Sequence, residues 1–264
     1  MEGSLRNCLL VLVCLPLLSG CAYFRAGPTL PDSLLVRDQL VIRSDFKLPQ
    51  KHRLLEELLA IRGDLVAALD IPISDEPIHL YLFNEAETYR EFIESAYPGL
   101  PSRRAFFVEG DTRLTVFAHW GDRVAEDLRH EVAHGYLHAV TPNMPLWLDE
   151  GLAEHFEVPR GYDGYHADHA AKLLDLIETA SWRPDLLRLE RLGTISDMAQ
   201  KDYAEAWLWV HFLLHTSRER KILLQHHLAL LREHGQSPPL SEAIWQTSPA
   251  VDDDLIAYLR LLAS

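Results

Sequence analysis

The segment "LRHEVAHGYLH", residues 128–138, carries two histidines and a glutamate at a spacing that suits metal chemistry. An α-helix turns about 100° per residue, so His130 and His134 lie on one face, one turn apart, and can bind one metal ion together. Glu131 lies on the flank of that face, where its carboxylate can reach a water molecule bound to the ion. The segment therefore predicts a catalytic metal site. The alternative is an ordinary helix whose histidines face solvent.

A third ligand is available in "WLDEGLAEHFE", residues 147–157. On a helix, Glu150 and Glu154 share one face, and the turn residues "TPNMP" allow an antiparallel return that brings Glu150 beside the histidines. Catalytic zinc often takes two histidines, one glutamate and a water molecule. Because ligand histidines usually donate their other ring N–H, a second carboxylate, Glu154, also has a use. The alternative for both glutamates is a solvated acidic face.

Together, "HEVAH" and "WLDEGLAEHF" resemble the gluzincin metallopeptidases, and more narrowly the peptidase-MA-like domains of exported bacterial proteins. The resemblance covers residues 75–215. It implies a thermolysin-like core, one Zn²⁺ ion held by His130, His134 and Glu150, and hydrolysis of peptide bonds in a peptide or protein substrate. It also implies that Glu131 is the general base and that Glu154 accepts a hydrogen bond from a metal-ligating histidine.

The same resemblance assigns two further parts. "KDYAEAWLWVHFLLH" looks like a family segment whose tyrosine steadies the oxyanion, which makes Tyr203 a catalytic candidate. The alternative is a core aromatic residue with its hydroxyl satisfied. The family binds its peptide along an edge strand, for which "RLTVFAHW", residues 113–120, is the candidate. His138 does not fit a third-histidine pattern and is expected at the rim. The seven histidines from His155 to His227 have no motif and are assigned to the surface or to packing.

The N-terminal residues read as an export signal. A basic start, a short apolar run and "LSGC" predict a signal peptide over residues 1–20. "LSGC" resembles the lipobox of bacterial lipoproteins, which implies lipidation at Cys21 and a membrane anchor there. Ala22 after the cysteine favours the outer membrane, with the chain facing the periplasm. A buried core helix is the alternative for this run.

The composition limits the partners. All three cysteines lie at or before Cys21, so residues 22–264 offer neither a thiol nucleophile nor cysteine ligands for zinc. The formal net charge of −14 argues against nucleic acid as a partner. It also argues against broad contact with anionic lipid headgroups, beyond the anchor. The oligomeric state is left open.

The elements expected around these residues belong to an α+β fold with a small mixed sheet followed by a mainly helical C-terminal part. A short tether is expected over residues 21–32 and an α+β part over 33–121, containing strands within 33–46 and 77–83 and a hairpin within 103–120. Helices are expected over 48–70 and 84–97, with Asn84 as the N-cap. Residues 122–264 hold the histidine helix and the helical part, and 33–264 are expected to form one catalytic unit.

Two rival functions remain at this point. One is a non-catalytic zinc-binding or interaction lipoprotein that keeps a peptidase-like fold. The other is a structural lipoprotein in which the histidine motif arose by chance. Metal content and hydrolysis of a generic protein separate the three.

Overall fold

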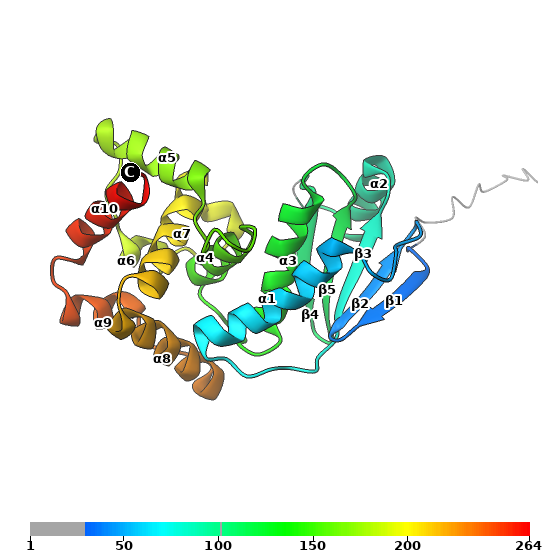
Figure 1. The fold of residues 1–264 in the computed structure, drawn as a ribbon, viewed down its shortest axis with the longest axis horizontal. Coiled ribbons are helices and arrows are strands. Elements are labelled where there is room, and N and C mark those ends of the chain that lie inside the picture. The colour runs from blue at the N-terminus through cyan, green and yellow to red at the C-terminus, as the bar shows by residue number, and fades with distance from the viewer. Residues whose placement is uncertain (1–29, 101) are drawn as a thin grey trace, which may run out of the picture.

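The structure is a computed structural model that describes residues 30–100 and 102–264. The signal peptide over 1–20, the lipidation site at Cys21 and the tether up to residue 29 lie outside the described residues. The fold is α+β, with a five-stranded mixed sheet followed by a mostly helical part (Figure 1). None of the described helices is both long enough and apolar enough to cross a bilayer.

The sheet has the order β1-β2-β3-β5-β4. β1 (Ser33–Arg37) and β2 (Leu40–Ser44) form a hairpin, as do β4 (Ala105–Gly110) and β5 (Arg113–His119). β3 (Ile78–Phe83) lies parallel to both β2 and β5 and joins the hairpins. The β4–β5 hairpin confirms the expectation for residues 103–120. β1 and β2 confirm the strands expected within 33–46, but their pairing as a second hairpin was not predicted.

The expectation that residues 113–120 form an edge strand is wrong. β5 is an interior strand that pairs with β3 on one side and β4 on the other. The first strand of its hairpin, β4, is the edge on this side of the sheet, and β1 is the edge on the other side. A hairpin pattern fixes the partner of each strand, but it does not say which strand a third, distant strand will join. The open edge therefore belongs to Ala105–Gly110.

Helices cover both faces of the sheet. α2 (Ala86–Ala96) packs on an aromatic face that includes Tyr81, Phe83 and Phe117. α1 (Arg53–Leu69) and α3 (Val124–His138) cover the aliphatic face. The helix expected at 84–97 is confirmed as α2, but its N-cap is Glu85 and not Asn84, whose side chain instead donates to the Glu85 carboxylate.

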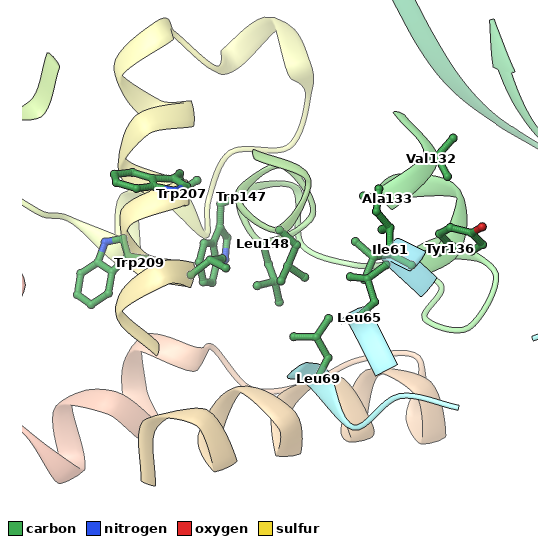
Figure 2. Packing of buried hydrophobic residues seen from close by; sticks show 14 of the residues in the cluster. Ile61, Leu65, Leu69, Val132, Ala133, Tyr136, Trp147, Leu148, Trp207 and Trp209 are labelled. Atoms are coloured by element: carbon green, nitrogen blue, oxygen red, sulfur yellow. The ribbon is translucent and has the colours of Figure 1, made fainter. Parts of the chain in front are cut away.

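The helical part follows α3 along the chain. It contains α4 (Leu146–Phe156), α5 (Ala167–Glu178), α6 (Leu186–Leu189), a 3₁₀ turn (Ile195–Asp197), α7 (Gln200–His215), α8 (Arg218–His234), α9 (Leu240–Thr247) and α10 (Val251–Leu262). One apolar core runs through both parts of the fold. Figure 2 shows it passing from Trp207 on α7 through Leu148 on α4 to Leu65 on α1 and Ala133 on α3. The histidine helix α3 and its successor α4 thus sit at the junction.

Candidate metal centre

Two glycines allow the helices of the site to approach their neighbours closely. A Cβ on Gly135 of α3 would lie 3.0 Å from the Ile78 side chain of β3, so α3 lies tight against the sheet. A Cβ on Gly151 of α4 would lie 2.6 Å from the carbonyl oxygen of Ala206 on α7. Only glycine at position 151 leaves room for this close approach of the α7 backbone. α3 and α4 are thereby held between the sheet and α7.

The three expected ligands converge at this junction. The Nε2 atoms of His130 and His134 face each other at 3.2 Å. The Oε2 atom of Glu150 lies 3.5 Å from Nε2 of His130 and 3.9 Å from Nε2 of His134. Each residue offers one ligand atom, and the three atoms lie within 4.8 Å of one another. Two imidazoles and a carboxylate are a donor set that zinc favours.

The Glu150 carboxylate supports the fit of a cation to this set. Its Oε2 atom is buried and has no hydrogen-bond partner among the described residues, although it lies opposite both histidine nitrogens. A buried carboxylate oxygen without a partner is costly, and a bound dication would remove that cost. The donor set and the unpaired oxygen therefore both fit a metal ion such as Zn²⁺.

Two acidic residues that sequence reasoning missed orient the histidine rings. Nδ1 of His134 lies 2.8 Å from Oδ1 of Asp149, and Nδ1 of His130 lies 2.8 Å from Oε2 of Glu157. These contacts direct both Nε2 atoms towards Glu150. Asp149 sits next to Glu150 in the acidic segment, which was the only signal for it in the sequence.

Glu154 does not take the position expected for it. It was expected to accept a hydrogen bond from a ligand histidine, but its Oε2 atom instead contacts Nε2 of His169 on α5 at 2.8 Å. Asp149 and Glu157, which lie before and after Glu154 in the chain, contact the Nδ1 atoms of His134 and His130 in its place. Glu154 therefore belongs to the wall of the site.

Three further histidines extend this hydrogen-bonded shell. His138 bridges Oδ2 of Asp149 at 3.0 Å and Oε2 of Glu109 at 2.9 Å, so it connects β4 to the site. His166 contacts Glu157 at 3.1 Å, and its ring stacks on that of His169. The sequence pointed to no role in the site for His166 and His169, because they contact it only through the folding back of α5.

The charges of the cluster reinforce one another. Burial opposes protonation of His130, yet the nearby carboxylates of Glu150 and Glu157 hold its pKa well above the ordinary value. Burial likewise opposes ionisation of Asp149, but the neighbouring His134 and His138 hold its pKa below the usual range. The site is thus rich in ionised carboxylates, which favours a cation at its centre.

Glu131 lies beside the ligands in an open cleft. Burial raises the pKa of its carboxyl, while His130 and His134 partly oppose that rise. One arm of the cleft, of about 940 Å³, is lined by polar residues, and the other, of about 1090 Å³, is more apolar. Both arms reach His130, Glu131 and Glu150. A carboxylate with a raised pKa in a cleft is suited to act as a general base.

Tyr203 faces this cleft. It lines the polar arm, is only partly buried, and its hydroxyl accepts a hydrogen bond from Nη2 of Arg103 at 3.3 Å. Tyr203 is therefore not one of the buried core residues, although its hydroxyl does have a partner in Arg103. Arg103, which sequence reasoning did not single out, lines both arms of the cleft just before β4. The two residues supply hydrogen-bond donors opposite the glutamates.

Comparison with known proteins adds no assignment: no family model matches this chain, and no curated protein is significantly similar to it.

Proposed function

We propose that this protein is a zinc-dependent peptidase with a thermolysin-like core. The observation that carries the proposal is the convergence of His130, His134 and the buried, unpaired Glu150 oxygen beside Glu131 in one cleft. One Zn²⁺ ion held by the three ligands would lower the pKa of a bound water molecule towards about 7. The gluzincin resemblance of the two sequence segments is consistent with this chemistry.

The proposed roles of the chain's own residues follow from their positions. Glu131 accepts a proton from the attacking water and later delivers it to the leaving amine. Tyr203 and Arg103 donate hydrogen bonds to the oxyanion that develops at the scissile carbonyl. Asp149 and Glu157 keep the two ligand histidines in the required orientation.

The substrate in this proposal is an extended peptide that adds to the open edge of β4. Within the described part of the chain, β4 pairs with β5 alone, so its other edge is free. Main-chain hydrogen bonds along that edge would give affinity with little sequence preference. Tyr97, Leu100, Phe107 and Ile195 line the apolar arm beside it, which suits a large apolar substrate side chain.

We further propose that the protein is exported and anchored through a lipid at Cys21. The support for this is the signal-like N-terminus with its lipobox-like "LSGC". The substrate would then be a peptide or protein of the bacterial envelope, most simply the periplasm.

Metal content and hydrolysis of casein test the peptidase proposal together. The chain from Ala22 onward should bind zinc and hydrolyse casein. Glu131→Gln should keep the zinc at this site and lose activity by about 10²- to 10⁴-fold, because the base is removed and the ligands stay. Glu150→Ala should weaken zinc binding at this site. Glu178→Gln, an exposed change on α5, serves as the control.

Each contrary outcome has a separate meaning. Loss of zinc in Glu131→Gln would show that the roles of the glutamates are wrong. Zinc binding without any hydrolysis of casein or short peptides would favour a non-catalytic binding protein. A folded chain that binds no zinc would refute the proposal.

A further inference from the structure

A second histidine cluster lies outside the cleft, at the far end of the contact between α4 and α7. His155 comes from α4, and His211 and His215 come from α7, one turn apart. Each ring offers one nitrogen, and the three nitrogens lie within 4.8 Å of one another. The ring centroids are 4.4–5.5 Å apart. None of these residues lines either arm of the cleft.

The backbone holds these rings together. Gly151 and Ala206 bring α4 and α7 into close contact. About one turn further along both helices, the rings of His155 and His211 lie against each other. Gly164, in the loop before α5, has φ +74°, and a Cβ there would lie 2.0 Å from the His155 ring. Glycine is therefore required at 164 both for its backbone conformation and for the space that His155 occupies.

Two of the ring nitrogens are unpaired inside the protein. Nδ1 of His155 and Nε2 of His211 are buried and have no hydrogen-bond partner among the described residues. An orphaned buried polar atom is uncommon in a folded protein and points to a missing partner. The other nitrogen of His211, Nδ1, is 2.7 Å from the Tyr258 hydroxyl of α10. A ring fixed on one side and free on the other is the usual arrangement of a metal-ligating histidine.

The three rings also differ from the histidines of the first site in their partners. No side-chain hydrogen bond or ion pair joins the rings to a carboxylate within the described residues, in contrast to the histidines of the first site. Neutral imidazoles present lone pairs, which suit a transition-metal ion and not a hard cation such as Mg²⁺.

We propose that His155, His211 and His215 form a second metal site, which binds a divalent transition-metal ion of the Zn²⁺ type. Three imidazoles and one water molecule are a known tetrahedral zinc set. His215 is exposed, so its ring is free to adjust and the fourth position opens to solvent. Bond lengths of about 2.0 Å place ligand nitrogens roughly 3.3 Å apart, so the rings need only a small inward movement.

A metal ion here would tie α4 to α7. The same two helices carry Glu150 and Tyr203 on the side of the cleft, so the ion would hold the ligand helix against the tyrosine helix. Its proposed role is to stabilise the walls of the first site and not to take part in the reaction. The inference does not depend on peptidase activity.

Zinc stoichiometry of the full chain, made without a polyhistidine tag, tests the proposal. The chain is stripped with a chelator, loaded with Zn²⁺, desalted and analysed for metal per chain. His215→Ala should hold one equivalent less than the parent, because removing an exposed ligand empties the site without disturbing the core. His226→Ala, an exposed change on α8, should hold as much as the parent.

The double variant His130→Ala, His134→Ala isolates the second site. It should keep one equivalent of zinc and lose it when His215→Ala is added. If that variant does not fold, as judged by circular dichroism, the comparison of His215→Ala with His226→Ala decides alone. Equal zinc content in those two single variants would overturn the proposal, whatever happens at the first site.

Discussion

At the scale of the residue, the candidate metal centre depends on acceptors behind the ligands. Asp149 illustrates this, because its two oxygens contact His134 and His138 and its carboxylate is nearly buried. It is not one of the three expected ligands, yet its contact with Nδ1 sets the direction in which the His134 ring points. The sequence identified His130, His134 and Glu150 because helical spacing is local information. The sequence did not identify Asp149 as an acceptor, because a single aspartate on the flank of a helix has no spacing pattern that marks its role.

Asp149→Asn should weaken zinc binding at the first site by about 10- to 100-fold, because the amide loses the negative charge that holds the His134 ring. Competition with a chromophoric chelator, in the presence of His215→Ala to remove the second cluster, would measure this. Asp175→Asn, an exposed change on α5, is the matched control. An affinity within twofold of the parent would show that Asp149 does not orient the ligand.

At the scale of the element, the contact between α4 and α7 determines where Glu150 lies. Gly151 follows Glu150 directly and faces the Ala206 carbonyl and the Val210 side chain. The helix α4 cannot move away from α7 without moving Glu150 away from the histidines. The lack of a side chain at Gly151 thus couples the packing of α4 and α7 to the geometry of the site.

Gly151→Ala should lower the free energy of unfolding by about 1–3 kcal/mol, because the added methyl group overpacks the interface with α7. Gly63→Ala is the contrasting control. A Cβ at Gly63 on α1 meets nothing within 4 Å, so this change should stabilise the protein by up to about 1 kcal/mol through helix propensity. Urea unfolding of both variants measures the two effects. A Gly151→Ala protein as stable as the parent would remove the close-packing explanation.

The elements themselves were largely predictable, and their arrangement was not. Periodicity and turn residues predicted the β4–β5 hairpin, strand structure within residues 33–46, α1, α2 and the helical second half, since these patterns are local. The position of β5 inside the sheet depends on its parallel pairing with β3, some thirty residues earlier. The positions of Glu157, His166 and His169 around the site likewise depend on contacts with residues distant in the sequence. Non-local pairing leaves little trace in one sequence, so the edge strand was assigned wrongly.

At the scale of the whole molecule, one core joins the sheet to the helical part, and several histidines are buried within it. His227 on α8 is 5% exposed, and burial lowers its pKa to about 4 from an ordinary value of 6.5. Between these two values the unfolded chain binds a proton that the folded chain does not. Stability is therefore full above about pH 6.5 and falls as the pH drops towards 4.

This residue should contribute about 3 kcal/mol to the loss of stability between pH 7 and pH 4, because folding lowers its pKa from 6.5 to about 4. In His227→Asn, which keeps an acceptor for the Ser237 hydroxyl, the unfolding free energy should fall less steeply with acid. His226→Asn, next to it but exposed, should behave like the parent. Parallel pH profiles for all three proteins would exclude His227 as the cause.

The open edge of β4 has a consequence for how copies of the protein behave towards one another. A free strand edge is a template on which a second copy can pair, and such pairing leads to aggregation unless something prevents it. Here the net charge of −14 makes every copy repel the next. Salt shortens the reach of that repulsion to about 10 Å at 0.1 M, so self-association should rise with ionic strength. The acidity of the chain thus keeps the strand edge available for partners less acidic than the protein itself.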